Sequence, residues 1–122
     1  MVIAKCINKE EIMKPERGDL LRGTLEMLIL RSLEDGSRHG YGITERLQEV
    51  SDEVLTVDEG SLYPALYRMQ RRGWLTSKWG RSENNRKARF YSLTRKGRRQ
   101  LERAAKSWTR FSEAVTKAMK PT

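Results

Sequence analysis

The stretch of residues 58–93 constrains the fold most, because a helical apolar pattern is followed at once by two strand-forming segments. Within residues 61–72, apolar side chains recur three and four positions apart, as they do on one face of a helix. Gly73 follows, and glycine commonly ends helices because it adopts a left-handed conformation without penalty. Residues 74–79 and 89–93 are then rich in strand formers, and a polar loop with one glycine and two asparagines separates them. The sequence therefore predicts a helix followed by a β-hairpin.

Two more amphipathic helices are expected before this stretch. Asp19 can cap a first helix whose apolar residues recur at helical spacing as far as Leu33, and residues 34–37 end it. A second, shorter helix is expected from about Tyr41. Its buried face would carry Ile43, Leu47 and Val50. His39 comes just before this helix, so a turn or helix-start role is expected for it rather than catalysis.

The third helix is expected over residues 58–72, and its start has two alternatives. If Ser61 is the N-cap, Pro64 lies in the first turn, where a proline is tolerated because the first amides have no helical partner. If the helix starts at Asp58, Pro64 lies further inside and implies a kink. Residues 54–57, which precede this helix, would form one small strand or an extended connector.

Three helices, a small strand or connector and a hairpin in this order form the winged helix pattern, an elaboration of the helix-turn-helix. From residue 95 onward, apolar residues again recur three and four apart over nearly three heptads. The expected fold class is therefore mainly α, within the α+β class: a three-helix helix-turn-helix core, a two- or three-stranded β wing and a long C-terminal helix. The expected domains are an N-terminal extension over residues 1–18, a winged helix-turn-helix domain over residues 19–94 and a dimerisation helix over residues 95–122.

The apolar stripe of the C-terminal helix needs an apolar partner. Because the winged domain is largely complete by Leu93, we expect this helix to pack against the first helix and against its equivalent in a second subunit, which gives a homodimer. The alternative is that the helix folds back on the core of its own subunit. The residues expected at the dimer interface are Leu21, Leu25, Leu101, Ala104, Trp108, Phe111 and Val115.

The charge distribution favours a nucleic acid as the partner. The formal net charge is +9, and residues 78–99 hold nine basic residues against one acid, so this segment alone carries +8. Clustered lysines and arginines release counterions when they neutralise phosphates, and double-stranded DNA is the expected partner. Because charge alone does not separate DNA from RNA, a basic RNA-binding or ribosome-associated module is the alternative. The sequence lacks the RNP-like aromatic strands and the Gly-X-X-Gly clamp that RNA-binding modules of this size carry.

Other classes of function find little support. Cys6 is the only cysteine and His39 the only histidine, so no Cys/His metal site and no intramolecular disulfide are expected. No nucleophile, base and orienting residue come together in the sequence, and no glycine-rich phosphate loop occurs; we therefore expect neither an enzyme nor a cofactor. The first 13 residues lack the apolar region of a signal peptide, and no run approaches a membrane-spanning length, so we expect a cytoplasmic protein without a membrane partner.

The third helix has two faces with different expected roles. Its core face carries the apolar residues Leu62, Ala65, Leu66 and Met69. The opposite face offers hydroxyls, aromatic rings and guanidinium groups, which can meet phosphates, base edges and thymine methyls in a major groove. The residues expected on that face are Ser61, Tyr63, Tyr67, Arg68 and Arg71.

From about residue 19 to its end, the chain resembles the PadR family of transcription regulators in four ordered blocks. These are Gly40-Tyr41-Gly42-Ile43, Glu59-Gly60-Ser61-Leu62-Tyr63-Pro64-Ala65-Leu66, Gly73-Trp74-Leu75 and Tyr91-Ser92-Leu93-Thr94. The resemblance implies a dimeric winged-helix repressor that binds inverted repeats and is released by a small ligand or signal. Residues before Asp19 exceed the usual start of the family.

The resemblance also implies positions for the DNA-contacting residues. The family's third helix corresponds to residues 59–72, which puts Ser61, Tyr63, Tyr67 and Arg68 near the DNA. The family's wing corresponds to residues 79–89. Near the loop tip, Arg86 and Lys87 would reach an adjacent minor groove or its flanking phosphates. Further back, Arg81 and Arg89 would contact the DNA backbone.

Trp108 has a further implied role. The stretch Ser107-Trp108-Thr109-Arg110 resembles one in which some PadR relatives carry an aromatic residue that lines a cavity between subunits. The resemblance therefore makes Trp108 a candidate ligand-binding residue for a small hydrophobic or aromatic effector, because a planar ligand can stack between two tryptophan rings. The alternative is that Trp108 forms an ordinary part of the interface core.

Overall fold

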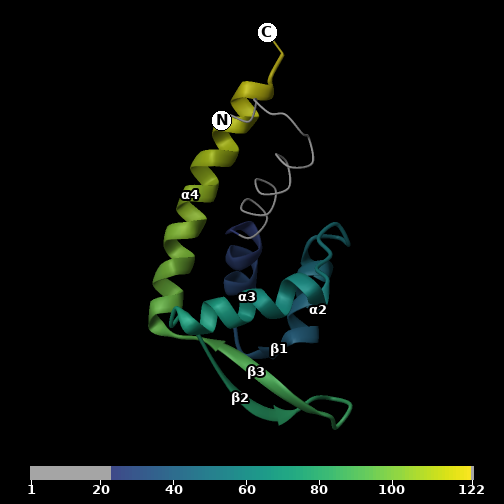
Figure 1. Ribbon diagram of the computed structural model, residues 1–122. Helices are drawn as coiled ribbons and strands as arrows, with labels where there is room; N and C mark the ends of the chain where they lie inside the picture. Colours follow the sequence, from purple (N-terminus) through teal and green to yellow (C-terminus); the bar gives the residue numbers. More distant parts are fainter. Residues whose placement is uncertain (1–22, 122) are drawn as a thin grey trace, which may run out of the picture.

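The computed structural model describes residues 23–121 and consists of helices around a small antiparallel sheet (Figure 1). Residues 23–32 are helical, and turns follow through residue 36. The remaining elements, in chain order, are β1 (Arg38–His39), α2 (Gly40–Val50), α3 (Glu59–Arg71), β2 (Leu75–Arg81), β3 (Lys87–Leu93) and α4 (Arg95–Met119). The expected mainly α winged helix fold is confirmed.

The sheet has the strand order β1-β3-β2, and both pairings are antiparallel. Strands β2 and β3 pair along their full length, from Leu75 opposite Leu93 to Arg81 opposite Lys87. We call this hairpin and its turn, residues 75–93, the wing. The third strand is β1, which lies before α2 and pairs Arg38 with Tyr91. Residues 54–57 form no strand, so the extended connector is the alternative that applies there.

The hydrophobic core draws on the first helix, α2, α3, β2, β3 and the start of α4. Its fully buried members are Ile29, Leu30, Leu33, Ile43, Leu47, Leu62, Ala65, Leu66, Met69 and Leu75, with Tyr91 and Leu101 at its edge. The apolar face expected for α3 is confirmed. Val50 was expected on the buried face of α2 but is exposed, because it is the last residue of the helix and lies one turn beyond the part that reaches the core.

Leu101 corrects the expected division between the domain and the dimerisation helix. Its side chain is 6% exposed and belongs to the core of its own winged domain, whereas we expected it at the dimer interface. Gly97 is buried as well, and a Cβ atom there would collide with the carbonyl oxygen of Trp74. The first two turns of α4 therefore complete the winged domain, and only the later turns extend beyond it.

Side-chain caps fix where α2 and α3 begin. His39 is the N-cap of α2, and its Nδ1 accepts a hydrogen bond of 3.0 Å from the amide of Gly42, in agreement with the expected helix-start role. Asp58 is the N-cap of α3, and its Oδ1 accepts a 2.8 Å hydrogen bond from the amide of Ser61. Of the two alternatives, α3 thus starts at Asp58, and Pro64 lies inside it. Because proline has no amide hydrogen, the Gly60 carbonyl loses its helical donor.

The end of α3 and the start of α4 are joined directly. Gly73 has a φ of +81°, a conformation that favours glycine, and this lets the chain leave α3 and enter β2. The hydroxyl of Thr94 donates to the carbonyl of Gly73 over 2.6 Å and accepts from the amide of Gly97 over 3.0 Å. Thr94 is therefore both the N-cap of α4 and the link to Gly73, the residue that follows the C-cap of α3.

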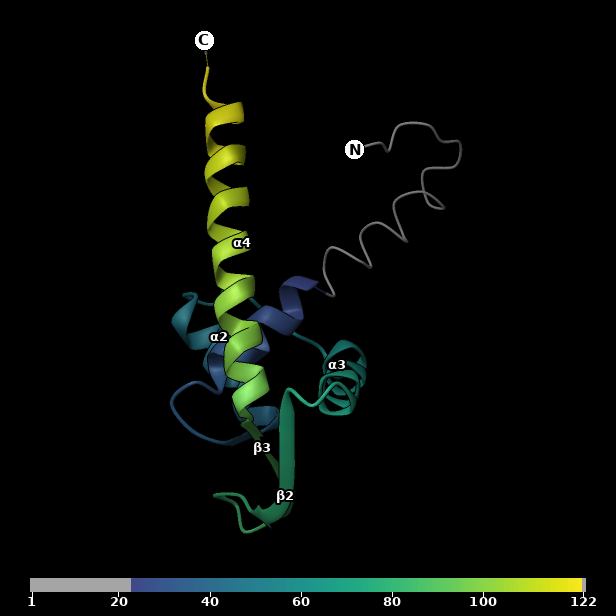
Figure 2. The ribbon, with the colours of Figure 1, turned by 90° about the vertical axis from the view of Figure 1, so that its left-hand side faces the viewer.

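Beyond the winged domain, α4 projects away from the body of the molecule (Figures 1 and 2). Its 25 residues correspond to a rod of about 37 Å. No helix among the described residues has the length and apolar character needed to cross a membrane. The N-terminal extension over residues 1–18, the cap Asp19, Cys6 and the expected interface residue Leu21 lie outside the described residues.

Candidate nucleic-acid interface

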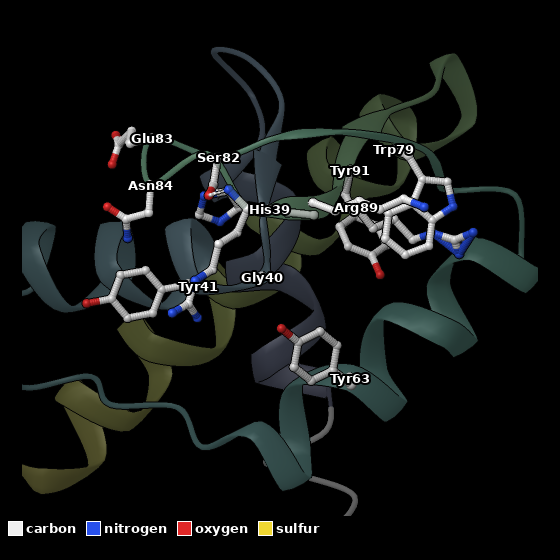
Figure 3. Close-up of a pocket in the computed structure, with 13 residues that line it drawn as sticks. His39, Gly40, Tyr41, Tyr63, Trp79, Ser82, Glu83, Asn84, Arg89 and Tyr91 are labelled. Carbon is white, nitrogen blue, oxygen red and sulfur yellow. Dashed lines mark hydrogen bonds between the residues drawn. The ribbon is translucent and has the colours of Figure 1, made fainter.

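A groove of about 680 Å³ lies between the wing and the N-terminal parts of α2 and α3 (Figure 3). Three cations and one acid are among the side chains that line it, so the groove is positively charged. Its lining residues include Tyr41, Tyr63, Trp79, Glu83, Arg86, Lys87, Arg89 and Tyr91. Among the residues of α3, Tyr63 lines this groove, and the remaining exposed residues of α3 lie outside it.

Tyr63 lies in the groove in close contact with Gly40, the first residue of α2. The Gly40 Cα lies directly under the Tyr63 phenol, and a Cβ at residue 40 would collide with the phenol oxygen. Figure 3 shows the Tyr63 ring rising from α3 toward Gly40 at the start of α2. Glycine at residue 40 therefore permits the position of the Tyr63 ring.

The other residues expected on the outer face of α3 are exposed, with one exception. Ser61 is exposed, and Tyr67 is 63% exposed, with the guanidinium of Arg71 5.7 Å from the centre of its ring. Such a cation over an aromatic face is attracted by the ring quadrupole. Ser61, Tyr63, Tyr67 and Arg71 thus remain available to a ligand on this face.

Arg68 is the exception, because it is turned toward the first helix. Its Nε lies 3.1 Å from Oε2 of Glu26, and Nη1 of Arg72 lies 3.4 Å from the other carboxylate oxygen. The Glu26 carboxylate is largely buried, so it needs these two cations as partners. We expected Arg68 to contact DNA. Its guanidinium instead pairs with the buried carboxylate of Glu26 in the first helix.

The tip of the wing is a tight turn with a fixed conformation. Asn85 adopts a left-handed conformation, with a φ of 59°, and its amide donates to the Ser82 carbonyl over 2.8 Å. Nη1 of Arg81 donates to the Asn85 carbonyl over 3.1 Å, which ties this guanidinium to the turn. Arg86 follows the turn and is exposed. Arg86 thus lies at the tip of the wing and Arg81 lies further back, and the DNA contacts expected for them stay a prediction.

Two cations of the wing lie over one aromatic ring. The Nζ of Lys87 is 5.0 Å from the centre of the Trp79 ring, and the Arg89 guanidinium carbon is 4.9 Å from it. Sequence reasoning did not single out Trp79 as a site residue. The signal that could have found it is the hairpin register, because Trp79 pairs directly with Arg89 across the two strands.

Burial changes the acidity of one groove residue. Tyr91 lies on β3 behind Trp79 and Arg89 (Figure 3) and is nearly buried. Desolvation raises the pKa of its phenol above the ordinary value of 10, and this effect outweighs the opposing charge of Arg89. Tyr91 is therefore held as the neutral phenol.

The later turns of α4 form a separate apolar stripe. Trp108, Phe111 and Val115 are 44%, 55% and 41% exposed, and the first two rings contact each other with their centres 6.0 Å apart. Ala104 is half-buried, and Leu25 packs against the core of the winged domain. Of the residues expected at a dimer interface, three are thus exposed on one face of a helix.

Comparison with known proteins agrees with this architecture. A transcriptional regulator from Clostridium thermocellum has a similar structure, with a TM-score of 0.75 and 26% identity, over 84% of this chain and 99% of that one. A PadR-like transcriptional regulator from Bacillus cereus is 31% identical, with a TM-score of 0.71, over 85% of this chain and 99% of that one. PadR from Bacillus subtilis, solved in complex with operator DNA, is 25% identical, with a TM-score of 0.58, over 65% of this chain and 45% of that one.

The family model described as "Transcriptional regulator PadR-like family" matches residues 29–103, which is more than half of the chain. The resemblance stated from the sequence is thereby confirmed, together with the expectation of a regulator rather than an enzyme. The chain belongs to the PadR-like family of transcriptional regulators.

Proposed function

We propose that this protein is a sequence-specific DNA-binding transcription regulator that acts as a homodimer on an inverted-repeat operator. The observation that carries the proposal is the positively charged groove between the wing, the start of α2 and Tyr63 of α3. The operator complex of the similar Bacillus subtilis PadR supports DNA as the ligand rather than structured RNA.

In this proposal α3 enters the major groove with its outer face toward the bases. Tyr63 and Tyr67 supply phenol hydroxyls and ring edges for base contacts, while Ser61 and Arg71 contact phosphates. We leave Arg68 out of this set, because the Glu26 carboxylate already binds its guanidinium. The wing contributes Arg81, Arg86, Lys87 and Arg89, which neutralise phosphates or enter the neighbouring minor groove.

The apolar stripe on α4 supports the homodimer. Trp108 and Phe111 are about half exposed on the part of α4 that extends beyond the winged domain, so they leave apolar surface in contact with water. The same stripe of a second copy would bury this surface. A two-fold axis through such a contact would place two α3 helices in successive major grooves, about one helical turn apart. An inverted-repeat operator matches this symmetry.

Repression and release by an effector complete the proposal. A dimer bound over a promoter would exclude the transcription machinery, which gives repression. A small planar hydrophobic effector would stack on Trp108 between the subunits, where the neighbouring Phe111 ring extends the aromatic surface. A titration with a planar fluorescent dye, followed by the emission of the dye itself, tests this role. A Trp108→Ala protein that binds the dye equally well would contradict it.

The decisive experiment measures binding of the protein to a labelled DNA duplex from the region upstream of its own gene. Binding is measured at two salt concentrations, with random duplex DNA and structured RNA as competitors. We expect binding that resists both competitors and weakens with salt. Arg86→Gln should weaken binding to all duplexes alike and reduce the salt slope by about one unit, whereas Tyr67→Ala should mainly reduce the preference for the operator. If random DNA or RNA displaces the labelled duplex from the protein, the proposed specificity is contradicted.

A further inference from the structure

Trp79 has a surface position that burial of an apolar ring does not explain. It lies on β2, in the middle of the wing, and is 57% exposed. Both neighbouring cations on β3, Lys87 and Arg89, lie over its ring at 5.0 and 4.9 Å. Resting on the DNA-binding function proposed above, we propose that Trp79 is a positioning residue that holds Lys87 and Arg89 as one paired phosphate-binding site for the DNA strand crossing the groove.

The strand register brings these three side chains to the same face of the wing. Trp79 is directly opposite Arg89, and Arg81, two residues further along β2, is directly opposite Lys87. Side chains two residues apart on a strand point to the same side, so Lys87 is the diagonal neighbour of Trp79. In Figure 3, Trp79 and Arg89 lie together at one end of the groove, with Tyr91 beside them. The pair of cations is thus directed into the groove.

The two cations are free to bind an anion. Within residues 23–121, the ion pairs involve other arginines, and neither Lys87 nor Arg89 takes part in one. The single acid that lines the groove is Glu83, at the wing turn. Two unpaired cations on one strand repel each other, and the attraction of both to the electron-rich Trp79 ring offsets part of this repulsion. The ring therefore keeps both charges close together without neutralising either.

Holding these side chains before DNA arrives lowers the cost of binding. Lysine and arginine lose much rotamer freedom when they are fixed on a phosphate, and a side chain already held on a ring loses less. The opposite wall of the groove carries Tyr63, whose hydroxyl faces the same space (Figure 3). A phosphodiester strand that runs between α3 and the wing would pass between this hydroxyl and the two cations.

A double-mutant cycle on the full-length protein tests the proposal. Operator affinity is measured by fluorescence anisotropy for the wild type, for Trp79→Leu, for Lys87→Gln/Arg89→Gln and for the triple variant. Trp79→Leu should weaken binding roughly 5- to 30-fold, because both cations are then unconstrained in the free protein and lose more rotamer freedom when they bind phosphate. In the Lys87→Gln/Arg89→Gln background the same change should weaken binding less than twofold. Trp79→Phe should recover part of the operator affinity. The control Lys78→Gln, on the other face of β2, should weaken operator binding no more than the loss of any single surface charge does.

The outcomes are distinct. An equal loss from Trp79→Leu in both backgrounds would overturn the proposal, because the ring would then act independently of the cations. No loss in either background would also overturn it. Failure of the wild type to bind the operator would instead contradict the proposed function. Thermal unfolding of each variant confirms that it is folded, and a flatter dependence of log K on log salt in Trp79→Leu, by up to about 1.8, identifies lost phosphate contacts.

Discussion

The guanidinium of Arg68 and the carboxylate of Glu26 form an ion pair, with Nε and Oε2 3.1 Å apart, that fastens α3 to the first helix. The two residues are 42 positions apart in sequence, so the contact is a long-range one. A basic residue of α3, the helix proposed to face DNA, thus has a structural role, and its removal should affect folding before recognition.

We expect Arg68→Ala to lower the free energy of unfolding by about 1–3 kcal/mol, because the largely buried Glu26 loses one of its two partners. Urea unfolding followed by circular dichroism measures this change. Arg71→Ala is the matched control at an exposed arginine of the same helix, and it should stay within about 0.5 kcal/mol of the wild type. Equal stability of the two variants would show that the ion pair does not stabilise the fold.

Gly40→Ala should reduce DNA affinity more than stability. The added methyl group collides with the end of the Tyr63 side chain, which can rotate away at small cost, but the ring then leaves its place in the groove. We expect at least a tenfold weaker operator complex at a nearly unchanged melting temperature. Gly42→Ala is the control, because a Cβ there meets only ordinary contacts of 3.4 Å or more. If both variants bind alike, the position of Tyr63 is not important for binding.

Phe111→Lys should convert the proposed dimer to a monomer. A lysine in the middle of the apolar stripe would place a charge in the interface without an acidic partner, and burial of an unpaired charge is strongly unfavourable. Analytical ultracentrifugation measures the change in mass. Glu113→Lys introduces the same residue on the opposite side of α4 and should leave the mass unchanged. A dimer that survives Phe111→Lys would place the interface elsewhere.

Stability should fall at high pH through Tyr91. Its pKa is raised in the folded state by burial, so the folded protein holds the phenolic proton more tightly than the unfolded chain, whose value is near 10. The resulting stabilisation is fully present below pH 10 and is lost as the pH rises through the folded pKa. Urea unfolding from pH 8 to pH 11 should therefore show a decline that is smaller in Tyr91→Phe. An identical decline in both proteins would contradict this assignment.

The sequence predicts the local elements well and the long-range contacts poorly. The apolar spacing within α3, the two strand-forming segments and the long α4 are each contained in one short window, and all three were predicted. Strand β1 was missed because two residues carry too little pattern, and β1 forms only by pairing with a strand more than 50 residues away. Val50 was placed on the wrong face because periodicity does not show where a helix passes beyond the core.

The site residues show the same difference between local patterns, which the sequence predicts, and long-range contacts, which it does not. Exposure of Tyr63 and Tyr67 follows from helix periodicity alone, and it was predicted. The destination of Arg68 depends on Glu26, a residue of another helix, and no local pattern contains that information. Leu101 continues the stripe of α4 without interruption, so the sequence does not indicate that the stripe changes from core to surface after it.

The hydroxyl of Thr94 connects the start of α4 to the segment that follows α3 through the Gly73 carbonyl, so the start of α4 is held next to the end of α3. A tilt of about five degrees over a rod of about 37 Å displaces its far end by about 3 Å. This displacement is close to the rise of one base pair, about 3.4 Å. In the proposed dimer, a small change of the crossing angle at the α4 contact would therefore be enough to change the distance between the two α3 helices. That distance would then no longer match the helical repeat of the DNA.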